Sequence, residues 1–226
     1  MGWSDYCQTF DQQLKLGIIE EVDEQQPQGP HVYYIPHQAV TKQDSNTTKL
    51  RIVFDASSHR RGSPSLNDCI HQGPTMLPDL CGTLLRSRLN PFLITADVEK
   101  AFHQIRLQED QRDATRFLWL KNPNKPPTKE NIRILRFTRI PFGINASPFL
   151  LNISIKYALE RDSSNRLREE ILANTYVDNV LIGAKSTDEC IMKQRECKDT
   201  FPQRIHVQQR RSYANNLGQR PYDPKI

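Results

Sequence analysis

The chain has 226 residues, a formal net charge of +5 and 37% hydrophobic residues, which suffices for one large domain or two small ones with a buried core. Its longest apolar runs fall far short of the roughly 20 residues that span a bilayer, so we expect no transmembrane helix and no membrane partner. The opening "MGWSDYCQTF" lacks the basic and apolar parts of a secretory signal. We therefore expect an intracellular protein, either cytoplasmic or nuclear.

The cysteines favour reduced thiols. There are five, with no C-x-x-C pair among them, which is unlike a disulfide framework. Cys69, His71 and Cys81 are of zinc-binding residue types, but a fourth ligand is missing and the spacing is loose. We prefer buried or free thiols to a zinc site.

The first half of the chain shows helix and strand patterns in alternation. Phe10, Leu14 and Ile18 recur at a spacing of four, which predicts a short amphipathic helix over residues 11–22. Residues 31–40 and 50–57 predict two strands of a hairpin around the polar turn "TKQDSNTT". Residues 77–89 repeat leucine at helical spacing and predict a helix.

The second half continues the same mixture. A buried strand is expected at 91–98, further strands at 115–120 and 132–140, a helix that opens with proline at 148–162, two short strands within 174–184 and a capped helix at 186–201. Because strands and helices are interleaved, we predict an α+β fold in which a layered sheet is covered by helices.

Two acidic residues stand where strands are expected to end. Asp97 closes the apolar run "FLITA", and such a residue alone is usually a turn former or a helix cap. The pair Asp178-Asn179 suits a tight hairpin turn, yet the flanking strands are apolar, and a carboxylate between them needs a partner or a cation to offset desolvation. Two carboxylates from distant strand ends are what Mg²⁺ prefers, with phosphates and water completing its shell.

Five sequence blocks resemble one known family. The blocks "LRIVFDAS", "SLND", "ITADVEKAFHQI", "FTRIPFGINASPFLLN" and "YVDN" stand in the order of the reverse transcriptase motifs, and their wording is most similar to the polymerase of BEL/Pao-type LTR retrotransposons. The resemblance runs from about residue 10 to residue 192. It implies the α+β fold of reverse transcriptase fingers and palm, with an antiparallel palm sheet covered by helices and no thumb.

The resemblance also implies domain limits. A fingers and palm domain is expected at 1–192, with fingers at about 10–90 and in part of 112–140, and palm at about 91–111 and 141–192. Residues 193–226 no longer resemble the family. They are basic and poor in aliphatic residues, so we expect a divergent, poorly ordered tail.

The metal-binding residues follow from the resemblance by position. Asp97 matches the first palm aspartate, the backbone carbonyl of Val98 follows it, and Asp178 matches the first aspartate of the YxDD hairpin. Together they imply two Mg²⁺ or Mn²⁺ ions that support transfer of a nucleotide to a primer 3′-hydroxyl. The implied partners are a primer-template of RNA or DNA and dNTPs.

Four more residues match the nucleotide site of the family. Phe102 matches the aromatic residue that excludes a 2′-hydroxyl, and Arg51 matches the fingers arginine that contacts the triphosphate, with either Lys42 or Lys49 assisting. Phe142 and Gly143 match the turn that cups nucleotide and template. Without the resemblance, Phe102 reads as a core aromatic and Arg51 as a solvated surface side chain.

One catalytic position departs from the family. Asn179 stands where a second aspartate is expected, so a carbonyl oxygen without negative charge replaces a carboxylate. Two interpretations follow: an RNA-directed DNA polymerase with reduced activity, or a catalytically silent nucleic-acid-binding or scaffold remnant of the same fold. A third is a reading frame without a stable product, and the unusual tail supports it.

Overall fold

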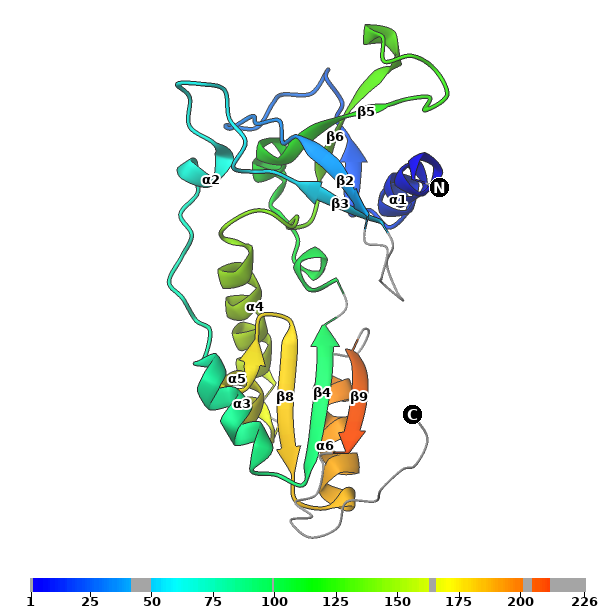
Figure 1. Cartoon of the computed structure of the whole chain (residues 1–226). Coiled ribbons are helices and arrows are strands. Elements are labelled where there is room, and N and C mark those ends of the chain that lie inside the picture. The colour runs from blue at the N-terminus through cyan, green and yellow to red at the C-terminus, as the bar shows by residue number, and fades with distance from the viewer. Residues whose placement is uncertain (1, 42–49, 99, 163–165, 201–204, 212–226) are drawn as a thin grey trace. The chain divides into compact units, whose positions relative to one another are not determined.

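A computed structural model describes residues 2–41, 50–98, 100–162, 166–200 and 205–211. The chain divides into two compact units. The first unit comprises Met1–Pro74 and Lys100–Leu151, and the second comprises Thr75–Glu99 and Asn152–Ile226. Figure 1 shows the elements of each.

The first unit holds two antiparallel sheets and the N-terminal helix. One sheet has the strand order β1-β6-β5, and the other is the hairpin β2-β3. Its helices and strands are α1 (Trp3–Lys15), β1 (Ile19–Glu21), β2 (His37–Thr41), β3 (Leu50–Phe54), α2 (Leu66–Cys69), the 3-10 helices η1 (Ala101–Gln104), η2 (Glu109–Thr115) and η3 (Lys129–Asn131), β5 (Arg116–Leu120) and β6 (Ile132–Phe137).

Aromatic side chains form the core of the first unit. Phe10 of α1 stacks on Phe117 of β5 with ring centroids 5.2 Å apart, and Phe54 of β3 meets Phe137 of β6 edge-on at 4.8 Å. Phe10, Phe117 and Phe137 are almost completely buried. Aromatic pairs in these arrangements add to the free energy gained from burial, so the cluster joins α1 to both sheets.

Helix α1 starts and ends earlier than the apolar spacing predicts. Gly17 adopts a φ of 60° and the Ile18 N–H donates to the Gln13 carbonyl at 2.9 Å, which is the bonding of a Schellman C-terminus. Ile18 therefore leaves the helix and leads into β1. The glycine decides this end, because its backbone enters the left-handed region without steric cost.

The second unit is a four-stranded antiparallel sheet with helices packed on it. The strand order is β7-β8-β4-β9, and the chain runs through it as strand, helices, two strands, helix and strand, a split β-α-β arrangement. Its elements are α3 (Leu80–Arg88), β4 (Phe92–Val98), the later part of α4 (Ser147–Arg161), α5 (Arg168–Ala173), β7 (Thr175–Tyr176), β8 (Asn179–Ala184), α6 (Thr187–Thr200) and β9 (Ile205–Arg211).

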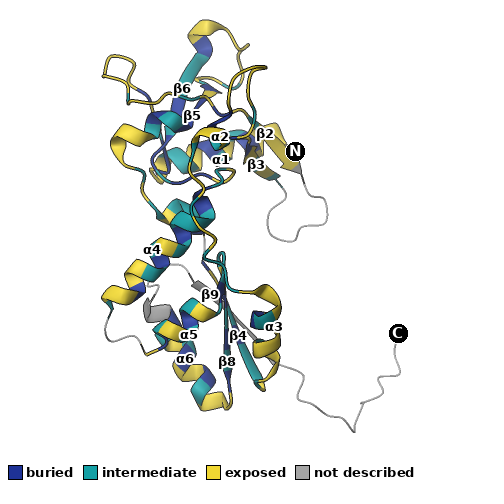
Figure 2. Ribbon diagram, turned by 90° about the vertical axis from the view of Figure 1, so that its left-hand side faces the viewer, coloured by how far each residue is buried: buried dark blue, intermediate teal, exposed yellow. Residues whose placement is uncertain are grey.

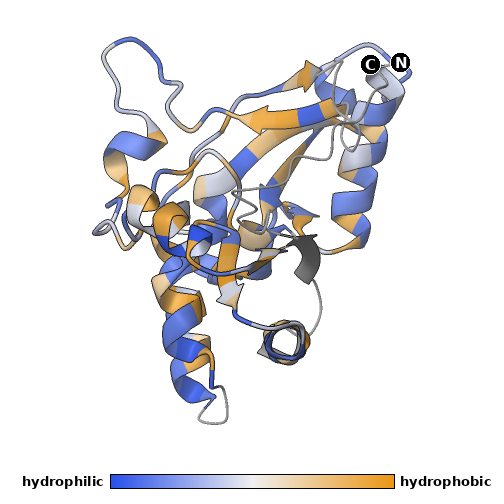
Figure 3. Cartoon of the chain, turned by 60° about the horizontal axis from the view of Figure 1, so that its bottom comes forward, coloured by the Kyte–Doolittle hydropathy of each residue, from blue (hydrophilic) through white to orange (hydrophobic). Residues whose placement is uncertain are grey.

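One face of this sheet is covered and the other is more open. On β4 the alternate residues Ile94, Ala96 and Val98 are buried, whereas Asp97 between them is exposed. Helices α3, α5 and α6 pack against the strands, and Figure 1 shows α6 running along β4 and β9. Figure 2 shows buried and half-buried residues along β4 and β8, and Figure 3 shows hydrophobic residues along the strands. The predicted α+β class with antiparallel sheets and covering helices is confirmed.

The expected domain limit at residue 192 falls inside α6. Lys193 and Cys197, which follow that limit, are buried, and the Lys193 ammonium contacts the Glu170 carboxylate at 2.8 Å and donates to the Gly183 carbonyl at 2.8 Å. Strand β9 then pairs with β4 along its length. Because strand pairing uses backbone groups, a segment poor in aliphatic residues can still complete a sheet. The last part of the expected tail, 212–226, lies outside the described residues.

Within the described part of the chain, no helix is both long and apolar enough to cross a membrane.

Candidate active site

The strand register places the predicted metal-binding residues together. Asp97 of β4 lies directly across from Asn179 of β8, and the Val98 N–H donates to the Asp178 carbonyl at 2.9 Å. Residues directly opposite each other on antiparallel strands point to the same face. Asp97 and Asn179 therefore share the open face at one end of the sheet, with Asp178 beside them.

The hairpin turn lies one residue earlier than expected. Tyr176 pairs with Asn179, so Val177 and Asp178 occupy the turn, whereas the sequence suggested Asp178 and Asn179. Val177 adopts a φ of 58°. A β-branched residue in this region is strained, and such strain persists only where surrounding structure holds it. Here the paired strands β7 and β8 hold it.

The electrostatic setting differs from the expected buried carboxylate. Asp178 is half-buried, and Asp97 and Asn179 are exposed, because the turn stands at the end of the sheet rather than in its middle. The Asn179 amide donates to Asp178 Oδ1 at 3.0 Å. An aspartate at this position could not donate that hydrogen bond and would place a second negative charge beside Asp178.

The oxygen donors at this edge fit a hard divalent cation. Two carboxylates, the Asn179 amide oxygen and the Val98 backbone carbonyl are the ligand types that Mg²⁺ accepts, and Mg²⁺ takes few protein ligands when phosphates and water supply the rest. Across the ranges that the structure describes, no group of three or more His, Cys, Asp or Glu side chains is placed to hold a metal. The carboxylates at this edge are therefore two, those of Asp97 and Asp178.

The predicted nucleotide-binding aromatic residues meet in the first unit. Phe102 of η1 packs edge-on against Phe142, with ring centroids 4.8 Å apart, and Phe142 is 47% exposed. Gly143 has a φ of 99°, and a Cβ at this position would lie 2.2 Å from the Phe54 carbonyl oxygen. Only glycine fits this turn, because any side chain would collide with the end of β3.

Asn67, to which no predicted role was attached, holds this turn. Its amide donates to the Gly143 carbonyl at 3.1 Å, and its Oδ1 accepts from the Asn145 N–H at 3.0 Å. Ser65 and Asp68 fix Asn67 on α2 through a capping box. The block "SLND" carried the signal, since its serine and aspartate have the capping-box spacing.

His103 is a second residue without an assigned role. Its ring lies 5.4 Å from that of Phe142, and its Nδ1 is buried with no hydrogen-bond partner among the described residues. Burial, together with the positive charges of Lys100 and Arg139, lowers the pKa of His103 to about 4. A neutral imidazole therefore supports the Phe142 ring at neutral pH.

Arg51 lies on the exposed side of β3, across from Val40 of β2. Lys42 and Lys49, the two candidates to assist it, lie outside the described residues. Asp97, Asp178 and Asn179 thus lie together in the second unit, Phe102 and Phe142 pack together in the first unit beside Gly143, and Arg51 lies apart from both groups on β3. Their roles stay predictions.

The family model for reverse transcriptase (RNA-dependent DNA polymerase) matches residues 37–206. The chain therefore belongs to the reverse transcriptase family. A search of curated proteins finds no match.

Solved structures support the same fold. The protease-reverse transcriptase of prototype foamy virus is similar over 88% of this chain, with a TM-score of 0.58 and 16% identity, and a CSH mutant of it gives a TM-score of 0.62 and 18% identity. A foamy viral protease-reverse transcriptase, dRH, in complex with double-stranded DNA gives 0.57 and 18%. The chain spans only 22%, 22% and 28% of these three proteins, respectively.

Proposed function

We propose that this chain is an RNA-directed DNA polymerase domain that adds deoxynucleotides to a primer 3′-hydroxyl. One observation carries the proposal: in a chain of the reverse transcriptase family, Asn179 pairs with Asp97, and the Val98 N–H donates to the carbonyl of the adjacent Asp178. The sequences of the five motifs and the aromatic Phe142 support a BEL/Pao-type retrotransposon as its source.

The acidic residues would bind the metal ions of the reaction. Asp97, Asp178 and the Val98 carbonyl would hold two Mg²⁺ or Mn²⁺ ions. When bound, such ions lower the pKa of the attacking hydroxyl and neutralise charge on the triphosphate. The carboxylates of Asp97 and Asp178 would be in position before substrate arrives, so the protein would need to reorganise little during the reaction.

The nucleotide would be positioned by the first-unit residues. The Phe102 ring, braced by Phe142, would exclude a ribose 2′-hydroxyl, and Gly143 would let the backbone approach base and template. Arg51 would bind triphosphate oxygens through its planar guanidinium. A similar foamy viral protein has been solved with double-stranded DNA, which supports a primer-template duplex as partner.

A catalytically silent nucleic-acid-binding protein is the second candidate. Asn179 favours it, because the missing carboxylate removes negative charge from the metal site. A loss of about 3 to 5 kcal/mol of transition-state stabilisation would slow chemistry by roughly 10²- to 10⁴-fold. Such a protein would bind primer-template without extending it.

Primer extension on an RNA template tests the proposal. The natural chain, Asp97→Asn and Asn179→Asp are compared in Mg²⁺ and in Mn²⁺, with primer-template binding measured in parallel. We expect extension by the natural chain, loss in Asp97→Asn and a gain of roughly 10- to 100-fold in Asn179→Asp. If Asn179→Asp is the one protein of the three that extends the primer, the natural chain is catalytically silent. Binding without extension by any variant contradicts the polymerase proposal.

A further inference from the structure

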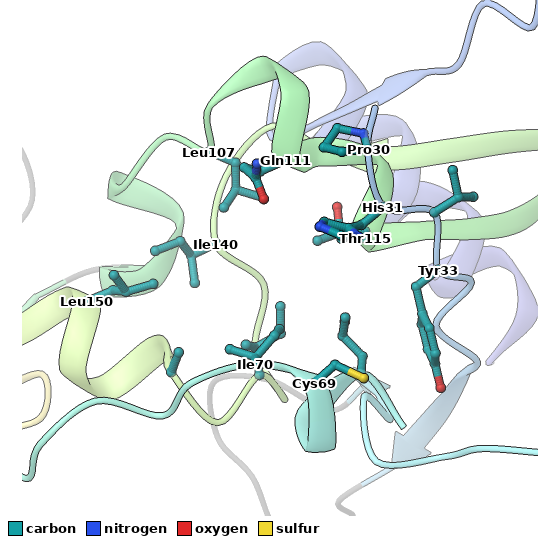
Figure 4. Close-up of a pocket in the computed structure, with 15 residues that line it drawn as sticks. Pro30, His31, Tyr33, Cys69, Ile70, Leu107, Gln111, Thr115, Ile140 and Leu150 are labelled. Atoms are coloured by element: carbon teal, nitrogen blue, oxygen red, sulfur yellow. The ribbon is translucent and has the colours of Figure 1, made fainter. Parts of the chain in front are cut away.

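A cavity of about 690 Å³ opens in the first unit, and none of the residues assigned to nucleotide or metal is among those that line it. Its walls come from four chain segments: the stretch that leads to β2, helix α2, helix η2, and the loop that runs into α4. Figure 4 shows side chains from all four pointing into one space. The volume is within the range of natural small-molecule sites.

The interior of the cavity is apolar, and its mouth is open to solvent. Leu66, Ile140 and Ala146 are at least 94% buried and form its floor, and Leu107, Ile144 and Leu150 add half-buried apolar walls. The cavity therefore offers a largely apolar surface to a ligand that enters from solvent.

Water is a poor occupant of this interior. A buried water needs two to four polar partners. The one buried polar side chain of the lining, Thr115, already donates to the Arg112 carbonyl at 2.8 Å and accepts from the Phe137 N–H at 3.1 Å. None of the described lining residues is Asp, Glu, Lys or Arg, so a phosphate or a carboxylate would find no counter-charge.

We propose that this cavity binds a compact neutral molecule with an aromatic or aliphatic body. The mouth carries the exposed polar groups of His31 and Gln111, which would meet a single polar end of the ligand. The ligand would also contact Ile140, Ile144 and Ala146, the residues on either side of the Phe142–Gly143 turn. Occupancy would thus stiffen the loop that carries this turn.

Cys69 supplies a local reporter for the test. Its thiol lines the mouth of the cavity and is exposed, and Cys81 on α3 is also exposed but lies in the other unit. The neutral dye N-phenyl-1-naphthylamine serves as the ligand probe. Maleimide labelling of both cysteines is followed by mass spectrometry of their peptides. We expect saturating dye to slow labelling of Cys69 about tenfold and to leave Cys81 unchanged.

A filled-cavity variant gives a second, independent readout. Ala114→Phe places a ring in the cavity from η2, and Ala158→Phe makes the same change at an exposed position of α4. We expect Ala114→Phe to weaken dye binding at least about tenfold, or about 1.4 kcal/mol, and Ala158→Phe to leave it unchanged.

The proposal is overturned if the dye protects neither cysteine, protects both equally, or binds Ala114→Phe and Ala158→Phe alike. If Ala114→Phe does not fold, the labelling comparison in the natural chain decides alone. Both readouts measure binding, so their outcome does not depend on whether the chain polymerises DNA.

Discussion

At the scale of single residues, the hairpin between β7 and β8 decides the charge at the candidate metal site. The Asn179 amide donates to Asp178 Oδ1 at 3.0 Å, so one carboxylate has a neutral partner. Asp97 lies across from Asn179 on the same face of the sheet. The site is therefore less negative than a trio of aspartates, and its cation affinity should respond to residue 179.

We predict that Asn179→Asp raises affinity for Mg²⁺. Without metal the variant should lose stability, because the amide hydrogen bond is lost and like charges are added. With saturating Mg²⁺, about tenfold tighter binding adds about 1.4 kcal/mol and would raise the melting temperature by about 3 to 5 °C more than in the natural chain. Differential scanning calorimetry with and without Mg²⁺ measures this. The control is the double variant Asp97→Asn, Asn179→Asp. If Mg²⁺ raises the melting temperature equally in this double variant and in Asn179→Asp, residues 97 and 179 do not share a metal site.

Glycine at position 143 gives a second residue-scale prediction. Gly143→Ala should destabilise the first unit by about 2 to 4 kcal/mol, because the new Cβ meets the Phe54 carbonyl oxygen and the backbone cannot yield cheaply. Gly62→Ala is the matched control: Gly62 has a φ of 81° but open space around it, so strain alone costs about 1 kcal/mol. Urea unfolding of both variants measures the loss in the free energy of unfolding. An equal loss in both would show that the contact with the Phe54 carbonyl adds nothing to backbone strain.

At the scale of elements, one buried ion-pair network joins several strands and helices of the first unit. Asp113 of η2 is 1% exposed and accepts from Arg116 of β5 at 2.9 Å and from Arg136 of β6 at 2.8 Å. The Gly29 N–H donates to the same carboxylate at 2.6 Å, and Glu20 of β1 pairs with Arg136 at 2.7 Å. Loss of one partner would leave buried charges without compensation.

We predict that Asp113→Asn destabilises the chain by about 3 to 5 kcal/mol. The exposed Asp110→Asn is the control and should change stability by less than about 0.5 kcal/mol. Chemical denaturation at neutral pH measures both. A loss in Asp113→Asn no larger than in Asp110→Asn would show that the network contributes little.

The same network predicts a dependence on pH. Burial by itself would raise the pKa of Asp113, but hydrogen bonds from Arg116, Gly29 and Arg136 outweigh it and lower this pKa to about 2. The native carboxyl thus binds its proton less readily than the unfolded one. Its contribution to stability is present above the ordinary pKa near 3.8 and is lost as pH falls toward about 2. Between about pH 4 and pH 2, the free energy of unfolding should therefore fall less steeply in Asp113→Asn than in the natural chain.

At the scale of the whole molecule, the second unit needs chain beyond the family motifs. Strand β4, which carries Asp97 near its end, is an inner strand of the sheet and lies between β8 and β9. Helix α6 buries Cys197 and anchors Lys193 to Glu170 on α5. Removal of α6 past residue 192 and of β9 would expose an edge of β4 and open the covered face, which favours aggregation.

We predict that a chain ending at residue 192 loses the cooperative unfolding of the second unit, and a chain ending at 211 keeps it. The longer truncation retains α6 and β9 and serves as the control. Hydrogen exchange of β4 and β8 amides reports on this unit directly, and protection should fall at least about a hundredfold in the shorter chain. Equal protection in both chains would show that β9 and the end of α6 are dispensable.

Local sequence patterns were enough to identify the family and the order of the helices and strands. Short motifs such as "ITADVEKAFHQI" and "YVDN" keep their residues next to one another in the chain, so they can be identified without a structure. Alternation of apolar and polar residues likewise predicted β6, because the two faces of a strand have different surroundings. An apolar run predicted β4, and two β-like segments around a polar turn predicted the β2-β3 hairpin. The departure at Asn179 was also visible at this level.

Features that depend on pairing between distant segments became visible only in the folded chain. Strand β9 joins β4 through backbone hydrogen bonds, which leave little trace in side-chain composition. The clamp of Asn67 on Gly143, the burial of Asp113 and the cavity near Cys69 each arise where segments far apart in sequence meet. Contacts of this kind depend on packing and register across the whole unit, and local sequence patterns do not encode either.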